Sequence, residues 1–187
     1  MAQPRVLVVN NGTLSLKQLR ARFEELGSDT DVVDAASVPA RLDGRHQAIV
    51  LSGTKVRAYD TDYYRPLIDL VMGSDVPVYG ICGGMQIIAV ANGGRLAEGP
   101  QRVGGHEAKV DKGEPLFAHV GETVTVFHRH TLYLQEAPAG FRSIGRSDHA
   151  PVEFLSSDDG RILGSQAHVE FRPDGLEILR GFAGLYQ

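Results

Sequence analysis

The chain contains a single cysteine, Cys82, which lies between Gly80 and the pair Gly83-Gly84. The residues 76–81 before it are β-branched and aromatic and predict a short buried strand, whereas the apolar pattern after it predicts a helix that ends at Asn92-Gly93-Gly94. A sharp strand-to-helix turn of this kind presents a nucleophile in many hydrolases. The positive end of the helix dipole would favour the reactive thiolate. The alternative is a structural cysteine, because a free thiol also behaves as a small hydrophobe.

A thiol nucleophile needs a base, and His168 is the best placed of the seven histidines. His168 and Glu170 follow the predicted strand 162–165, so we expect them at the same end of the sheet as Cys82. Side chains at i and i+2 of an extended segment project to the same side. Glu170 could therefore orient His168 while His168 holds the thiolate. A surface pair without catalytic role is the alternative.

The elements that position these residues alternate along the first half of the chain. Strands are predicted at 6–9, 31–33, 48–51 and 76–81, and helices at 14–26, 63–71 and 85–91. This alternation predicts an α/β fold with a mostly parallel, doubly wound sheet flanked by helices. Ligands bind at the carboxyl ends of such strands. Both Cys82 and the turn Ser52-Gly53-Thr54 would lie there.

The pattern changes after Leu96, where short strand-like pieces are separated by Gly, Pro and Asp. Strands are predicted at 108–110, 124–127, 141–144, 151–155 and 162–165, with a single turn at 115–117 and a closing helix at 175–185. We expect these to add antiparallel strands to the sheet. Residues 1–187 are predicted to form one domain.

The amino-acid composition restricts the classes of protein and of binding partner that the chain can represent. Of 187 residues, 42% are hydrophobic and 22% are charged, which is ordinary for a globular domain. With a formal net charge of −4, the chain lacks the positive electrostatic field that would attract nucleic acid or an anionic membrane. No apolar run approaches the roughly 20 residues of a spanning helix, and residues 1–5 lead into a strand rather than a signal peptide. We expect a cytoplasmic protein without disulfides.

His128 and His130 alternate along a predicted strand and would share one face. With His106 or His119 they could ligate a metal ion. Because no third ligand has a defined spacing, the stronger expectation is that the chain holds neither a metal nor another cofactor.

Two separated motifs resemble those of the class I glutamine amidotransferases. Residues 80–86 match the pattern Gly-Ile/Val-Cys-x-Gly-x-Gln, and residues 166–170 match Gln-Phe-His-Pro-Glu at His168 and Glu170. The resemblance covers nearly the whole chain, and its order and spacing are most similar to the stand-alone glutaminase subunits of GMP synthetase. It implies that Cys82, His168 and Glu170 hydrolyse L-glutamine through a γ-glutamyl thioester. Ammonia would pass to a synthetase partner of the ATP-pyrophosphatase type.

The resemblance also implies an oxyanion hole formed by backbone N–H groups of Gly83 and of the turn Gly53-Thr54. It places Gln86 near the substrate and brings Arg129 and His130 toward the glutamine pocket and the partner.

Several residues depart from the family pattern. The turn Ser-Gly-Gly-Pro reads Ser52-Gly53-Thr54-Lys55, so a side chain stands where the second glycine is expected. The motif Ser-His-x-Asp reads Arg129-His130-Thr131-Leu132, so Leu132 replaces the acidic residue. These departures keep open a stand-alone hydrolase or amide-transfer enzyme that acts on another γ-glutamyl or amide substrate. A non-catalytic relative that binds a partner is a third hypothesis, which the intact triad residues disfavour.

Overall fold

The computed structural model describes residues 2–55 and 59–187, which form one nine-stranded sheet and four α-helices. The strands are β1 (Arg5–Asn10), β2 (Asp29–Asp34), β3 (Ala48–Leu51), β4 (Val78–Ile81), β5 (Leu96–Val110), β6 (Thr123–Leu134), β7 (Phe141–Arg146), β8 (Phe154–Ser157) and β9 (Ile162–Ser165). The helices are α1 (Leu16–Glu25), α2 (Arg65–Gly73), α3 (Gly83–Ala91) and α4 (Pro173–Ala183), with 3-10 turns η1 (Ala35–Ser37) and η2 (Pro115–Phe117).

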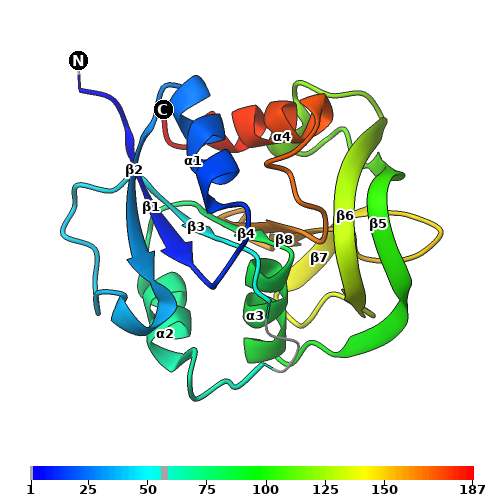
Figure 1. Cartoon of the computed structure of the whole chain (residues 1–187), viewed down its shortest axis with the longest axis horizontal. Helices are drawn as coiled ribbons and strands as arrows, with labels where there is room; N and C mark the ends of the chain where they lie inside the picture. The colour runs from blue at the N-terminus through cyan, green and yellow to red at the C-terminus, as the bar shows by residue number, and fades with distance from the viewer. Residues whose placement is uncertain (1, 56–58) are drawn as a thin grey trace.

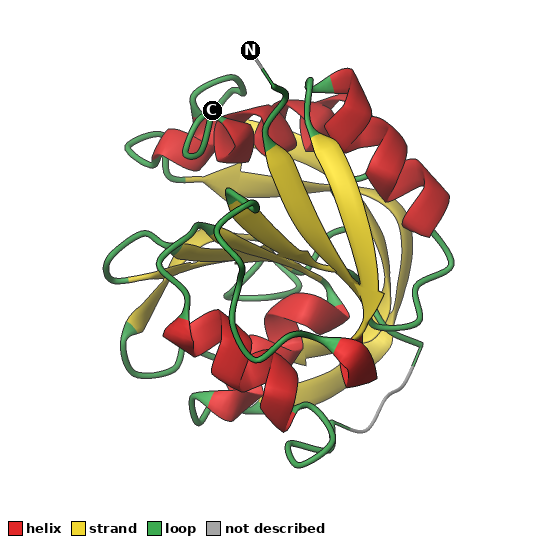
Figure 2. Cartoon of the chain, turned by 90° about the vertical axis from the view of Figure 1, so that its left-hand side faces the viewer, coloured by secondary structure: helices red, strands yellow, loops and turns green. Residues whose placement is uncertain are grey.

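The strand order across the sheet is β2-β1-β3-β4-β9-β8-β7-β5-β6. Strands β2, β1, β3, β4 and β9 pair in parallel, and the pairings from β9 to β6 are antiparallel. Helices α1 and α4 cover one face of the sheet, and α2 and α3 cover the other (Figures 1 and 2). The predicted α/β class is confirmed, including the added antiparallel strands.

The central parallel strands β3 and β4 are buried throughout because both of their faces are covered, whereas the edge strand β2 is polar and partly exposed. In β1, Val6 and Val8 join the cluster formed with α1 and α4, whereas Leu7 and Val9 join the cluster formed with α2 and α3. The continuous apolar runs that predicted central strands therefore serve two hydrophobic layers.

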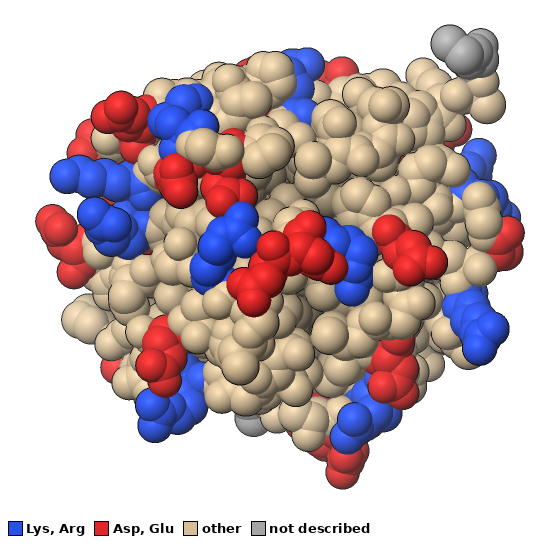
Figure 3. Space-filling view, turned by 180° about the vertical axis from the view of Figure 1, so that it is seen from behind, with Lys and Arg blue, Asp and Glu red and all other residues tan. Residues whose placement is uncertain are grey.

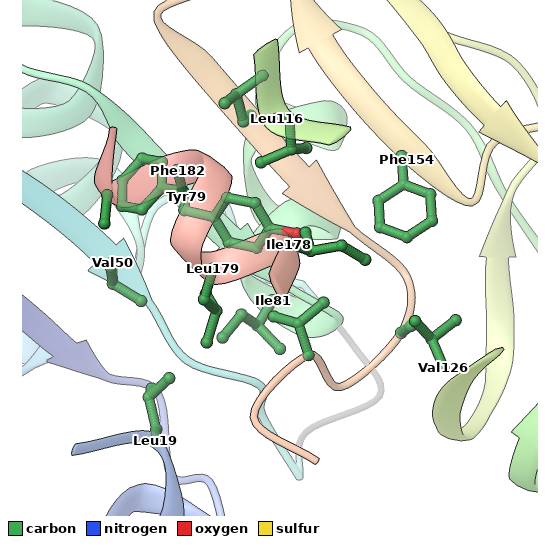
Figure 4. Close-up of a cluster of buried hydrophobic side chains, with 14 of the residues drawn as sticks. Leu19, Val50, Tyr79, Ile81, Leu116, Val126, Phe154, Ile178, Leu179 and Phe182 are labelled. Carbon is green, nitrogen blue, oxygen red and sulfur yellow. The ribbon is translucent and has the colours of Figure 1, made fainter. Parts of the chain in front are cut away.

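The larger cluster lies between α4 and the centre of the sheet (Figure 4). Tyr79 of β4 packs on Phe182 of α4 with ring centroids 5.3 Å apart, and Leu179 and Ile81 lie beside them. These side chains are fully buried and hold β4, which leads into the cysteine turn, rigidly against α4.

In the antiparallel half, the predicted strand 162–165 and the turn 115–117 coincide with β9 and η2, but other predicted boundaries are wrong. Strands β5 and β6 form a hairpin far longer than the pieces predicted at 108–110 and 124–127. Gly99-Pro100 and Gly104-Gly105 look like strand ends in the sequence. A register irregularity between Glu98 and Arg102 accommodates the first pair, and pairing with β6 resumes at Arg102. It then continues through Gly104, which adopts a φ of +98°, and Gly105. Strand β8 likewise begins at Phe154, three residues after the predicted start.

The surface carries both signs of charge. Basic and acidic side chains are interspersed over the face in Figure 3, as expected for a net charge of −4. No helix in the described part of the chain is long and apolar enough to cross a membrane.

Candidate active site

Cys82 occupies the turn between β4 and α3 in a strained conformation. Its φ of +48° and ψ of −105° are rare for a residue with a side chain, and strain of this kind costs about 1–3 kcal/mol. The turn closes because Gly80 and Gly84 have no side chains: a Cβ would lie 2.6 Å from Met85 N in the first case and 2.5 Å from Leu51 O in the second. Cys82 therefore stands at the N-terminus of α3, as the sequence predicts.

The structure brings His168 and Glu170 to this turn. Strands β4 and β9 pair in parallel with Ile81 opposite Ser165, and the Cys82 N–H donates to Ser165 O over 2.7 Å. Three residues beyond Ser165, His168 forms a bridge with Phe127 of β6. Its Nδ1 lies 2.9 Å from Oε1 of Glu170, so Nε2 is left to face the thiol.

Glu170 is held by groups from α1. The hydroxyl of Ser15, at the start of α1, donates to Glu170 Oε1 over 2.6 Å, and Nε of Arg22 donates to Glu170 O. Burial lowers the pKa of His168, but its hydrogen bonds to Cys82 and Glu170, and the charges of both, raise it to about 10. This environment therefore favours the protonated, imidazolium form of His168.

The three residues predicted for the oxyanion hole lie against the cysteine turn. A Cβ on Gly83 would be 2.3 Å from Thr54 Cγ2 and 2.9 Å from Thr54 N, and one on Gly53 would be 3.1 Å from His168 Cε1. The turn after β3 therefore touches both Gly83 and the imidazole. Backbone N–H groups in the first turn of α3 have no partner within the helix, which leaves them available to a ligand.

A cleft of about 870 Å³ opens above Cys82. Its walls include the predicted residues Gly53, Thr54, Gln86, Arg129 and His130 and also His168, while Gly83 is buried beneath. The described lining residues include three lysine or arginine side chains and no acidic one. These cations are Lys17, Lys55 and Arg129. A second groove, of about 810 Å³ along α1, contains no cysteine or histidine in its described lining.

Sequence reasoning did not assign a role to Gln166 or Tyr59. Nε2 of Gln166 lies 3.5 Å from Cys82 Sγ, and Oε1 of Gln166 accepts from Nε2 of Gln86 over 2.8 Å. The Tyr59 hydroxyl donates to Oε1 of Gln86. Gln166 is the first residue of the second motif, and that position is the one signal in the sequence that pointed to it.

His128 and His130 share a face of β6, as predicted, but they bind each other. His128 Nδ1 lies 2.9 Å from His130 Nε2, and His130 Nδ1 lies 2.9 Å from Leu132 O. Burial and the nearby Arg102 lower the pKa of His128 to about 2 and of His130 to about 4. Within residues 2–55 and 59–187 no three histidine, cysteine or acidic side chains group to hold a metal ion.

A buried ion pair lies behind these histidines. Arg102 Nη1 lies 2.5 Å from Glu153 Oε1, and the Ser147 hydroxyl donates to the same oxygen. Both charged groups are almost fully buried. The pair ties β5 to the segment that enters β8.

The sequence matches a known protein family over nearly its whole length. Residues 7–183 match the family model of the class-I glutamine amidotransferases. The chain is 32% identical over 183 residues to a glutamine-hydrolysing GMP synthase of Thermus thermophilus and 30% identical over 182 residues to that of Clostridium perfringens. These alignments cover 96% and 95% of this chain but only 36% and 35% of the relatives, so the chain spans about a third of the curated relatives' length.

Solved structures with the same fold are also known. A Thermoplasma acidophilum protein, described as part of a GMP synthase, superposes with a TM-score of 0.88 at 25% identity, covering 99% of this chain and 94% of the other. The PurLQS structure from Thermotoga maritima gives a TM-score of 0.77 at 15% identity, covering 99% and 100% of the two chains, which bears on the fold alone.

Proposed function

Because the chain belongs to the class I glutamine amidotransferase family, we propose that it hydrolyses the side-chain amide of L-glutamine and passes the ammonia to a synthetase partner. The observation that carries this proposal is the meeting of Cys82, His168 and Glu170: Cys82 and His168 line one cleft, and the buried Glu170 holds His168 from behind. Cys82 and the pair His168 and Glu170 come from two segments far apart in the sequence. Together they supply a nucleophile, a base and a group that orients the base, as nucleophilic catalysis requires.

In the proposed reaction, the Cys82 thiolate attacks the amide carbon of glutamine. The oxygen of the tetrahedral intermediate accepts hydrogen bonds from backbone N–H groups of Gly83 and of the turn Gly53-Thr54. His168 donates its proton to the leaving nitrogen, which departs as ammonia and leaves a γ-glutamyl thioester. His168 then takes a proton from water, whose oxygen attacks the thioester. Glutamate leaves and the thiolate is restored.

The proposed partner is a GMP synthetase-like protein of the ATP-pyrophosphatase type. Support comes from the relatives named as glutamine-hydrolysing GMP synthases, which extend well beyond the part that this chain matches. A partner would approach the mouth of the cleft, where Arg129 is exposed.

The test is glutamate release from L-glutamine, measured with the chain alone and with such a synthetase, its nucleotide acceptor, ATP and magnesium. We expect partner-dependent release that is lost in Cys82→Ala. The control is His119→Gln, which removes an exposed histidine and should leave release unchanged. Equal release by Cys82→Ala would refute the proposal.

The cleft's charge favours a second candidate function, the hydrolysis of a different amide by the chain alone. With Lys17, Lys55 and Arg129 and no acidic side chain among its described lining residues, the cleft suits an amide substrate with more negative charge than glutamine. If no glutamate is released in either condition while a thiol reagent still labels Cys82, a panel of amides that bear extra carboxylates becomes the next assay.

A further inference from the structure

A chain of hydrogen bonds runs from the cleft wall to the sulfur of Cys82 through two buried amides. Tyr59 contacts Gln86, Gln86 contacts Gln166, and Gln166 contacts Cys82 Sγ at 3.5 Å. Gln86 is 2% exposed and Gln166 is fully buried. A buried amide of this kind has only a structural role unless the orientation of its NH₂ and C=O ends affects a charged group.

The donor-to-acceptor direction of these hydrogen bonds follows from the backbone carbonyl of Leu132. Leu132 O can only accept, and it lies 3.0 Å from one end of the Gln86 amide, so that end is the NH₂ group. The same nitrogen lies 2.8 Å from Gln166, which must therefore present its carbonyl oxygen to Gln86.

The far ends of the two amides are then determined as well. Gln166 directs its NH₂ group at the sulfur. Gln86 directs its oxygen at the Tyr59 hydroxyl, which must donate. Burial, and secondarily the charge of Cys82, raises the pKa of Tyr59, so the phenol keeps its proton. In this series of hydrogen bonds each residue consequently donates to the next one nearer the sulfur: Tyr59 to Gln86, Gln86 to Gln166, and Gln166 to Cys82.

We propose that Gln166 is a further catalytic residue, whose side-chain N–H stabilises the Cys82 thiolate, and that Gln86 and Tyr59 are positioning residues that fix its direction. The sulfur thus receives hydrogen bonds from both His168 and Gln166. A donor to a charged group is stronger than one to a neutral group, so the thiolate gains more than the thiol does. Ionisation of the thiol, with its proton on His168, is favoured.

This inference deepens the proposed glutaminase function, but its test does not require glutaminase activity. Because the chain has one cysteine, alkylation by iodoacetamide reports on Cys82 alone. The rate is measured against pH for the unaltered chain and for Gln166→Met, Gln86→Met and Tyr59→Phe. Ser156→Ala is the matched control, since it removes a buried hydroxyl that donates to Ser157 O.

We expect the pH midpoint of alkylation to rise by about one unit in Gln166→Met, which is the effect of losing one hydrogen bond to a charged group. The rise should be smaller in Gln86→Met, where the amide of Gln166 is still present but is no longer held in one orientation. It should be smallest in Tyr59→Phe, because Gln86 keeps both its acceptors. A role that is only structural would lower the melting temperature without moving the midpoint.

A measurement on the unaltered chain keeps the test independent of folding. With ¹⁵N-labelled glutamine, the side-chain N–H resonance of Gln166 should move with the same midpoint as alkylation of Cys82. A Gln166 resonance that does not titrate overturns the proposal, as does a folded Gln166→Met variant whose midpoint coincides with that of the control. Failure of glutamine hydrolysis with these shifts intact would refute the proposed function alone.

Discussion

Replacing Glu170 with Gln tests how far the proton on His168 depends on a buried carboxylate. A glutamine keeps an oxygen that accepts from the Nδ1–H of His168 and from the Ser15 hydroxyl, so the contacts persist while the charge is lost. Because the charge of Glu170 is among the causes that raise the pKa of His168 to about 10, its removal should lower that pKa.

The magnitude follows from the single contact of 2.9 Å between Nδ1 and Oε1. A hydrogen bond to a charged group contributes about 1.5–3 kcal/mol and a neutral one about half as much, so the change is about 0.8–1.5 kcal/mol. This corresponds to a fall of about one unit in the pKa of His168. The same loss in the transition state would lower kcat/KM for glutamine about tenfold.

The assay combines a ¹⁵N titration of the His168 ring with kcat/KM measured against pH. In the proposed mechanism His168 protonates the leaving ammonia, and in Glu170→Gln it loses that proton at a lower pH. The alkaline limb of the kcat/KM profile should therefore move to lower pH. Glu177→Gln, which removes an acidic partner of Arg180 on α4, is the control. An unchanged titration of His168 together with full activity would refute the reasoning.

Three further predictions rest on neighbouring contacts. Gly83→Ala should lower kcat about 100-fold while Cys82 labelling persists, because the new Cβ would lie 2.3 Å from Thr54 Cγ2 and displace the turn proposed to hold the oxyanion. Glu153→Gln should cost about 3–5 kcal/mol in urea unfolding, because it leaves Arg102 buried without its counter-charge. Stability should also fall as pH drops from 6.5 to about 4, by up to about 1.4 kcal/mol per unit from His130 alone. Between these pH values His130 is protonated in the unfolded chain but neutral in the folded protein, so a lower pH favours unfolding. The midpoint of urea unfolding at each pH measures the loss of stability.

The parallel half of the fold was predictable from the sequence because its signals are local. Runs such as 48–51 are apolar on both faces, and that pattern is typical of a covered parallel strand. The glycines around Cys82 predicted a sharp turn for a reason that the structure confirms, namely that Met85 N and Leu51 O leave no space for a Cβ. Cys82 and the turn after β3 accordingly lie at one end of the sheet, as predicted.

The length of the β5–β6 hairpin and the amide chain were not predictable, because both depend on contacts between distant segments. Glycines in β5 resemble chain breaks until β6 is present to continue the ladder. The polar character of Gln166 gives no hint that Gln86, eighty residues away, orients its amide. Whether a buried amide donates to a thiolate or merely fills space is decided by the third group, here Leu132 O, that determines its direction.

The distance between Cys82 and His168, the proposed nucleophile and base, is set by the register of β4 against β9. Gly80 pairs with Gly164, and Ile81 with Ser165, immediately before Cys82 on one strand and three residues before His168 on the other. A Cβ on Gly164 would lie 2.6 Å from Met85 Cγ, so α3 packs directly over the strand pair and only glycine fits there. A slip of one residue would place a larger side chain, Leu163 or Ser165, beneath Met85 and would reverse the faces of β9. The packing that buries Met85 therefore also keeps His168 within reach of the thiol.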